Sequence, residues 1–271
     1  MKAQNAFLYD DIGTAYSRYR LPDGRIAAVI SREVADARFI VNIGAGVGAY
    51  EPRGKAIVAV EPSRVMTSQR KTHGNAVIQA RAEALPFRED TFDCALAVLT
   101  IHHWGNMENG LREAMRVTKG SLVLLTWIGF VSPFWLLDYL PQIKRTDEPL
   151  FPSLDRLSSW LGPLRSIPVP IPHDCTDGFL CAYWRRPEAY LDAGVRSAIS
   201  TFARVRDTGA GLDRLSRDLS TGAWHRKYGN LLQKHEMDFG YRLVVAAPHL
   251  HEPTEHEEKN GGCESSLRTP R

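Results

Sequence analysis

An apolar segment that runs directly into a glycine loop constrains the fold of this chain more than any other feature. Phe39–Ile43 is followed by the sequence GAGVGA, with Gly44, Gly46 and Gly48 at alternate positions. A second apolar segment then ends at one acid, Glu61. Glycine allows a sharp turn and a close backbone approach, and an acid after the next strand accepts hydrogen bonds from ribose hydroxyls. The order strand, glycine turn, helix, strand, acid predicts a nucleoside site in a doubly wound sheet.

The loop alone does not identify the nucleoside. Gly44, Gly46 and Ala49 also fit the pattern G-x-G-x-x-G/A, so a nicotinamide- or flavin-dependent oxidoreductase is an alternative. Glu61 comes 61 − 44 = 17 residues after the first glycine. The spacing in NAD sites is roughly 20 residues, and a difference of this size does not separate the alternatives.

Apolar strands alternate with helical segments through the first half of the chain. The strands are expected at Phe39–Ile43, Ile57–Val60, Ala76–Ala80, Phe92–Leu99 and Ser121–Trp127. The helix before the last of these strands is expected at about 108–117, ended by Lys119 and Gly120. This alternation predicts an α/β fold with a doubly wound, mostly parallel, seven-stranded Rossmann-like sheet covered on both faces.

Composition divides the chain into four expected regions. They are a cofactor-binding core with an N-terminal helical cap (1–128), a proline- and aromatic-rich helical lid (129–206), a C-terminal helix with the last strand (207–250) and a disordered tail (251–271). The lid includes one edge strand, Ser166–Ile171, and the last strand is Tyr241–Ala247. The tail is polar and lacks periodicity.

Bulk properties exclude several classes of function. The net charge of +3 over 271 residues, without a basic stripe, does not favour a nucleic acid partner. No apolar segment has the length of a signal peptide or membrane span, which predicts a cytoplasmic protein without membrane insertion. Four irregularly spaced cysteines predict neither a disulfide framework nor a metal site. A cluster of Cys175, Cys181 and Cys263, as in a thiol-dependent arsenic enzyme, is a further alternative. No sequence signal indicates the oligomeric state.

Residues 81–104, RAEALPFREDTFDCALAVLTIHHW, carry a further set of motifs. They resemble the third and fourth motifs of the class I S-adenosylmethionine-dependent methyltransferases, most closely the small-molecule branch with the ubiquinone and menaquinone biosynthesis enzymes. VNIGAGVGAYE and VAVEPS resemble the first two motifs, and the similarity covers about residues 7–128. The resemblance implies an enzyme with S-adenosyl-L-methionine as cofactor, which methylates an oxygen, nitrogen or carbon atom of a small molecule by in-line displacement.

The resemblance also implies the cofactor contacts. The glycine loop would face the methionine moiety, Glu61 would hold the ribose, Ala82 and Glu83 would flank the adenine, and Leu99 and Thr100 would lie beneath the sulfonium. The full expected set is Tyr9, Tyr16, Asn42, Gly44, Ala45, Gly46, Gly48, Glu61, Pro62, Ala82, Glu83, Leu99 and Thr100. Asn42 departs from the family, which usually has aspartate there, so a catalytically silent binding protein is another alternative. Its amide can still accept one loop hydrogen bond and donate another.

His102 and His103 follow the fourth strand, where α/β folds collect ligands, and one of them is the candidate general base. Alternatively, one histidine caps a turn or stacks on Trp104 while the other faces solvent. Arg20 would meet the methionine carboxylate or be an exposed arginine. His173, Asp174, Asp177, Tyr183 and Trp184 are candidates for the acceptor pocket, with helix capping and lid packing as the alternative.

Overall fold

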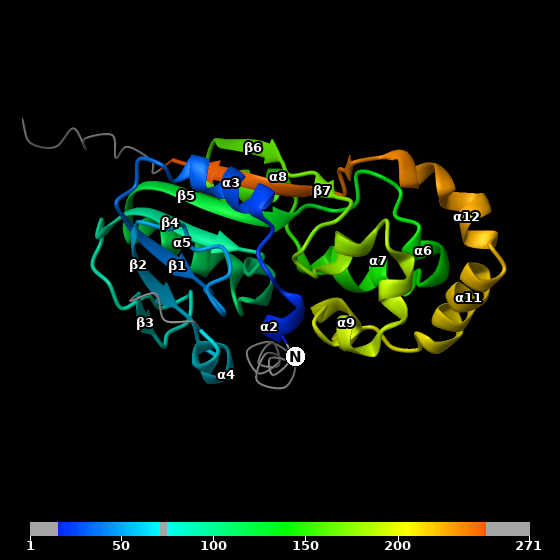
Figure 1. The fold of residues 1–271 in the computed structure, drawn as a ribbon. Coiled ribbons are helices and arrows are strands. Elements are labelled where there is room, and N and C mark those ends of the chain that lie inside the picture. The colour runs from blue at the N-terminus through cyan, green and yellow to red at the C-terminus, as the bar shows by residue number, and fades with distance from the viewer. Residues whose placement is uncertain (1–15, 71–74, 248–271) are drawn as a thin grey trace, which may run out of the picture.

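The computed structural model describes residues 16–70 and 75–247, so the expectations for Tyr9 and for the tail lie outside the described residues. Its sheet has the strand order β3-β2-β1-β4-β5-β9-β6 (Figure 1). The strands are β1 (Phe39–Ile43), β2 (Ala56–Val60), β3 (Ala76–Ile78), β4 (Phe92–Val98), β5 (Thr118–Trp127), β6 (Leu164–Pro168) and β9 (Tyr241–Ala246). The first five are parallel and β9 is antiparallel to β5 and β6. The predicted fold class is confirmed.

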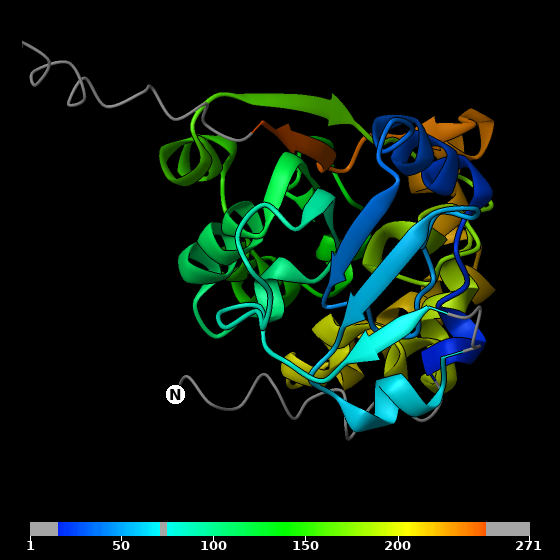
Figure 2. The ribbon, with the colours of Figure 1, turned by 90° about the vertical axis from the view of Figure 1, so that its left-hand side faces the viewer.

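Side chains of the central strands alternate between two cores. Ile40 and Leu96 belong to the core beneath α3 (Gly24–Glu33), whereas Val41 and Ala95 belong to the opposite core. That opposite core includes residues of α5 (Met107–Arg116) and α8 (Leu154–Leu161). Figure 2 shows α3, in blue, and α5, in green, on opposite sides of the sheet. Alternation of buried side chains is typical of a parallel sheet covered on both faces.

Local signals explain where these helices begin. Asp23 caps α3 by accepting a hydrogen bond from the Arg25 amide, and Ile26 and Ile30 then lie on the buried face one turn apart. Asn106 caps α5 in the same way through the amide of Asn109. The predicted N-terminal helical region thus includes a helix over 24–33. It is preceded by the short helix α2 (Tyr16–Tyr19).

The helix expected between the first two strands is absent. Residues 44–55 form turns, and the next described helix is α4 (Arg64–Ser68), after β2. Four glycines in this connection have positive φ, namely Gly44 (68°), Gly46 (52°), Gly48 (81°) and Gly54 (74°). Positive φ is incompatible with a right-handed helix, so a connection this short has no room for a helical run.

Gly120 does not end α5 as expected, because it lies inside β5. The helix ends at Arg116, and the strand begins at Thr118. A Cβ on Gly120 would lie 2.0 Å from the carbonyl oxygen of Asp93, at a point where the register between β4 and β5 shifts. Glycine is needed there for the close approach of two strands.

The remaining helices form a second lobe beside the sheet (Figure 1). They are α6 (Leu136–Tyr139), α7 (Gln142–Asp147), α9 (Ala193–Ser197), α10 (Ser200–Arg204), α11 (Gly209–Ser220) and α12 (Ala223–Tyr228), with the 3-10 helices η3 (Glu148–Leu150), η4 (Leu180–Tyr183), η5 (Pro187–Leu191) and η6 (Gly229–Gln233). Strands β7 (Ile171–Pro172) and β8 (Glu236–Met237) pair in a small second sheet. We call this lobe the lid.

The lid boundaries differ from the expected regions. Helix α8 and strand β6 fall within residues 129–206, but they pack on the core. Helices α11 and α12 fall within residues 207–250 and lie in the lid, where α11 contacts α6 and η5. The predicted edge strand corresponds to β6, at the end of the sheet. In the described part of the chain, no helix is both long and apolar enough to cross a bilayer.

Candidate active site

Two adjoining cavities lie where the sheet meets the lid. The glycine-loop cavity, at the carboxyl ends of β1, β2 and β4, has about 1120 Å³ of empty space including its opening. The lid cavity, with about 530 Å³, is lined by core residues such as Trp127 and by lid residues such as Phe151 and Phe179. Arg20, Leu99 and His103 line both cavities, so the two meet at these residues.

The glycine loop is tied to the end of β2 by backbone hydrogen bonds. The amides of Gly44 and Ala45 both donate to the Val60 carbonyl, at 2.8 and 3.0 Å. A Cβ on Gly44 would lie 2.1 Å from Oγ1 of Thr100, which follows β4. The absence of a side chain at position 44 therefore lets the loop pack directly on the end of β4.

Glu61 is held in a fixed orientation on the wall of the glycine-loop cavity. It is 7% exposed. Its Oε2 accepts a hydrogen bond from the Gly46 amide at 2.8 Å, and its Oε1 accepts one from the Ser63 amide at 2.9 Å. Two backbone donors thus orient the carboxylate before any ligand binds, which lowers the entropic cost of hydrogen bonds to a ligand.

Asn42 takes part in a buried polar cluster that the sequence did not indicate. Its Nδ2 donates to Oε1 of Glu51 at 3.1 Å, and Arg70 forms an ion pair with the same carboxylate at 2.6 Å. Asn75 donates to the other oxygen of Glu51 at 3.0 Å. Arg70 also donates to the Gly46 carbonyl at 3.1 Å. The described partner of the Asn42 amide is therefore Glu51. An aspartate at position 42 would place two carboxylates together.

Most of the residues expected at the cofactor line the glycine-loop cavity. They are Asn42, Gly44, Ala45, Gly46, Glu61, Pro62, Ala82, Glu83, Leu99 and Thr100. Gly48 borders a separate groove beside α3, and the side chain of Tyr16, like all of Tyr9, is outside the described part of the structure. Leu99 has a φ of 50°, which is rare for a residue with a side chain and is often found at functional sites.

His102 and His103 lie on the 3-10 helix η2 (Ile101–His103), with ring centroids 3.8 Å apart. His102 stacks on Phe151 at 4.1 Å and lines the lid cavity. Burial and the positive charges of Arg204 and Arg20 hold the pKa of both imidazoles well below the ordinary value, so both rings are neutral.

The two histidines differ in their hydrogen-bonding state. A guanidinium nitrogen of Arg204 lies 3.1 Å from Nδ1 of His103. Arginine only donates, so this Nδ1 accepts and the ring proton of His103 is on Nε2. Nδ1 of His102 is buried without a hydrogen-bond partner among the described residues.

Arg20 is an important cavity residue whose surroundings the sequence did not reveal. Its side chain is 11% exposed and forms a 2.5 Å ion pair with Asp177, so the expectation of an exposed arginine was wrong. The same carboxylate accepts a hydrogen bond from the Tyr50 hydroxyl at 3.0 Å. That hydroxyl in turn accepts one from the Asp23 amide at 3.2 Å. These contacts join the N-terminal segment, the connection after β1 and the lid.

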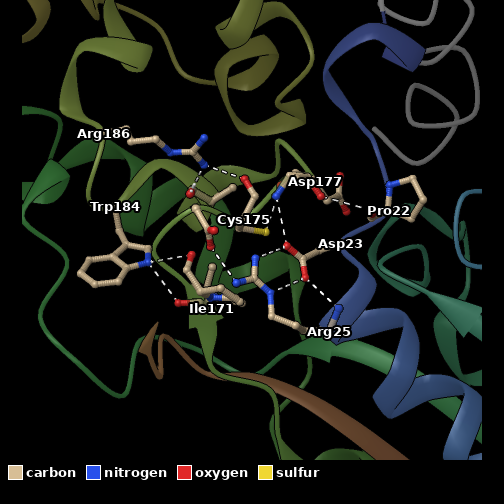
Figure 3. Close-up of polar contacts among 12 residues, drawn as sticks. Pro22, Asp23, Arg25, Ile171, Cys175, Asp177, Trp184 and Arg186 are labelled. Carbon is tan, nitrogen blue, oxygen red and sulfur yellow. Dashed lines mark hydrogen bonds and ion pairs between the residues drawn. The ribbon is translucent and has the colours of Figure 1, made fainter. Parts of the chain in front are cut away.

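A second group of contacts extends this junction (Figure 3). Arg25 donates to both carboxylate oxygens of Asp23 and to Asp174, and the Thr176 amide also donates to Asp23. Burial raises the pKa of Asp23, but hydrogen bonds from Arg25 and Thr176 outweigh burial and bring the pKa to about 2. The carboxylate is therefore ionised, and the lid is fastened to the start of α3.

The predicted acceptor-pocket residues do not gather in the lid cavity. Asp177 lines the glycine-loop cavity instead, and Asp174 is paired with Arg25 at the surface. Tyr183 and Trp184 are buried in the core, where Trp184 donates to the Ile171 and Pro172 carbonyls. Packing, the alternative considered for the aromatic residues, is what the structure shows for these two side chains.

Of the three cysteines of the thiol-cluster alternative, Cys263 lies outside the described residues. Cys175 and Cys181 are buried, and burial raises the pKa of both thiols. Among residues 16–70 and 75–247, no three histidine, cysteine or acidic side chains are arranged to hold a metal ion.

Several known proteins are similar to this chain in sequence and in fold. The profile of a family described as "Methyltransferase domain" matches residues 41–124. A crystal structure from Anabaena variabilis ATCC 29413, of a candidate methyltransferase from an antibiotic biosynthesis pathway, is 36% identical. Its TM-score is 0.79, and the matched region covers 84% of this chain and 98% of the Anabaena chain. The chain belongs to the class I S-adenosylmethionine-dependent methyltransferases.

Curated relatives of this methyltransferase match only part of it. An uncharacterized protein of Methanocaldococcus jannaschii is 31% identical over 121 residues, covering 43% of this chain and 48% of its own length. The 2-methyl-6-phytyl-1,4-hydroquinone methyltransferase 1 of Oryza sativa subsp. japonica is 29% identical over 133 residues, covering 45% of this chain and 38% of its own. The chain therefore spans less than half the length of either curated relative. The family prediction is confirmed, and the oxidoreductase alternative loses its support.

Proposed function

We propose that this methyltransferase binds S-adenosylmethionine in the glycine-loop cavity and methylates a small molecule held in the lid cavity. The observation that carries the proposal is the junction at Leu99, His103 and Arg20, where the two cavities meet. A methyl donor and an acceptor need adjoining sites because transfer requires close contact and alignment of the reacting atoms.

The residues of the glycine-loop cavity fit the proposed cofactor. The oriented Glu61 carboxylate offers acceptors for ribose hydroxyls, and Ala82 and Glu83 supply a wall for the adenine. Arg20 would approach the methionine carboxylate while it remains paired with Asp177. A sulfonium supplies a methyl group that is already activated, so the protein contributes mainly alignment and exclusion of water.

The lining of the lid cavity favours an apolar, planar acceptor. Trp127, Phe151, Phe179 and Tyr241 contribute aromatic surface to it. Aromatic side chains favour stacked or edge-to-face contacts with flat ligands. The rice relative is named for a hydroquinone, which has this chemical character, and this supports the same class of acceptor here.

If the acceptor must lose a proton, His102 is the better candidate base. It is neutral, lines the lid cavity, and has an unpartnered Nδ1 among the described residues. His103 accepts from Arg204, and a second proton on its ring would face that cation. We therefore assign His103 the role of a hydrogen-bond donor through Nε2 at the junction of the cavities.

The proposed function is tested by binding and transfer with the full chain. We expect S-adenosylhomocysteine to raise the melting temperature and to bind with a micromolar dissociation constant in isothermal titration calorimetry, whereas NADH and NADPH leave the protein unchanged. Incubation with labelled S-adenosylmethionine and a library of phenols and hydroquinones should yield a labelled product. Absence of S-adenosylhomocysteine binding would refute the proposal, and tight binding without transfer to any acceptor would indicate a catalytically silent protein.

The histidines give a second prediction once an acceptor is known. We expect His102→Gln to lower kcat by about 100-fold, the range for loss of a general base, with little change in cofactor affinity. His103→Gln should raise KM and lower kcat less, because glutamine also presents an N–H. Wild-type turnover in both variants would remove the base role from this pair.

A further inference from the structure

The lid cavity contains one acidic side chain, Asp147, in its described lining. Asp147 ends helix α7 and is 4% exposed. Its Oδ2 accepts a hydrogen bond from the Thr201 hydroxyl on α10 at 2.6 Å. Its Oδ1 is buried and has no hydrogen-bond partner among the described residues. The side chain is therefore fixed at one oxygen and unsatisfied at the other.

An unsatisfied carboxylate oxygen in such surroundings is unfavourable for the fold itself. The cavity around it is bounded by Trp127, Phe151, Ile199 and Tyr241, which offer mostly apolar surface. Burial of a polar atom without a partner destabilises the folded state, so such atoms are rare unless a ligand or water satisfies them. A ligand with a hydrogen-bond donor would give Oδ1 of Asp147 the partner that it lacks.

We propose that Asp147 determines acceptor specificity by accepting a hydrogen bond from a hydroxyl group on a neutral aromatic acceptor. This inference rests on the proposed function, since it assigns the acceptor to the lid cavity. Thr201 acts as a positioning residue, because its hydroxyl holds Oδ2 and leaves Oδ1 for the acceptor.

The charges around Asp147 favour a hydroxyl over an ammonium group. Arg204 on α10 contributes a positive charge next to Asp147, and Arg20 lines the same cavity. A cationic acceptor would be repelled by both positive charges. The other titratable groups that line this cavity or act on Asp147 are Cys181, Tyr241, His102 and His103, and all of them are uncharged near neutral pH.

The ionisation of Asp147 supports its role as an acceptor. Burial raises its pKa to about 6, against the lowering effects of the Thr201 hydrogen bond and the Arg204 charge. At a pH above this value most of the carboxyl is ionised, and an ionised carboxylate only accepts hydrogen bonds.

The test compares three probes of similar shape in the full chain saturated with S-adenosylhomocysteine. They are 2-naphthol, with a donor; 2-methoxynaphthalene, without one; and 2-naphthylmethylammonium, a cation. We expect 2-naphthol to bind at least about tenfold more tightly than either analogue, as measured by ligand-observed NMR titration, because a hydrogen bond to a charged group has this magnitude.

The variant Asp147→Asn should abolish the preference for 2-naphthol over its methyl ether. Thr201 would hold the amide oxygen, and the amide NH2 would then face the cavity and donate to either probe. Asp138→Asn is the matched control, because it makes the same exchange on α6 outside the lining of the lid cavity, where Asp138 pairs with Lys227, and it should keep the full preference. The melting temperature of each variant checks that it is folded.

Three results would overturn the inference: equal binding of 2-naphthol and its ether to the wild type, an unchanged preference in Asp147→Asn, or no binding of any probe. Failure of S-adenosylhomocysteine to bind would instead count against the proposed function. The two failures are therefore distinguishable, because cofactor binding is measured before the probes are added.

Discussion

Replacement of Glu61 with glutamine should weaken S-adenosylhomocysteine binding by about 100-fold, or about 2.7 kcal/mol, because charged hydrogen bonds to two ribose hydroxyls are replaced by weaker ones. The structure adds a second cause. Glu61 accepts from the amides of Gly46 and Ser63 through different oxygens. A glutamine has one acceptor oxygen, so one of these backbone donors would face an NH2 group and the side chain would turn.

Isothermal titration calorimetry with S-adenosylhomocysteine measures this effect. Glu113→Gln is the matched control, because the Glu113 carboxylate also accepts from a backbone amide, that of Leu85, but Glu113 is not among the residues that line the cavity. We expect the control to change affinity by less than about threefold, as for the loss of a weak contact. An unchanged affinity in Glu61→Gln would exclude the proposed ribose contact.

Substitution of Gly44 with alanine should destabilise the folded protein by at least about 3 kcal/mol. A left-handed backbone costs an L-residue about 1–2 kcal/mol, and the new Cβ adds a severe overlap. The φ of Gly44 is 68°, and its Cβ would lie 2.1 Å from Oγ1 of Thr100. The loop and the end of β4 would have to separate, which would also disturb the cavity between them.

Gly54 provides a control that separates these two costs. Its φ is 74°, but a Cβ there would have no described atom within 4 Å. Gly54→Ala should therefore show only the backbone cost in chemical denaturation. Equal destabilisation of the two variants would mean that contact with Thr100 is not the reason for glycine at position 44. Partial recovery of stability in the double variant Gly44→Ala/Thr100→Ala would support the contact.

Most strands of the large sheet were predictable because they are short apolar runs bounded by polar or glycine residues. Strand β6 begins two residues earlier than expected, and the small sheet of β7 and β8 was not predicted. Phe39–Ile43 was located to the residue, and the strand before Glu61 to within one residue. The same local patterns misplaced two features. The glycines after β1 exclude the expected helix, and Gly120 lies in a strand because the Asp93 carbonyl approaches it. The approach of the Asp93 carbonyl to Gly120 is a tertiary contact, on which local sequence carries no information.

The candidate site was predictable only where motifs follow the strand ends. Gly44 and Glu61 were named because each follows a strand, and Thr100 because the family resemblance implies it beneath the sulfonium; all three line the glycine-loop cavity. The Arg20–Asp177 pair joins residues 157 positions apart, so neither sequence neighbourhood indicates the contact. Asp147 was missed for the same reason, since only the folded lid brings it to Thr201.

The absence of a helix after the glycine loop has an electrostatic consequence. In many nucleotide-binding folds the helix that follows such a loop provides a partial positive charge through its aligned peptide dipoles. Here the connection of residues 44–55 has no such dipole. The positive side chains beside the loop include Arg20, which lines the cavity, and Arg70, which donates to the Gly46 carbonyl, and each is paired with a carboxylate. A helix dipole comes from the backbone, so it persists through nearly every side-chain substitution. The charge of an arginine is lost when that one residue is replaced by a neutral one. The electrostatic potential at this loop therefore depends on individual arginine side chains, and a single substitution can change it.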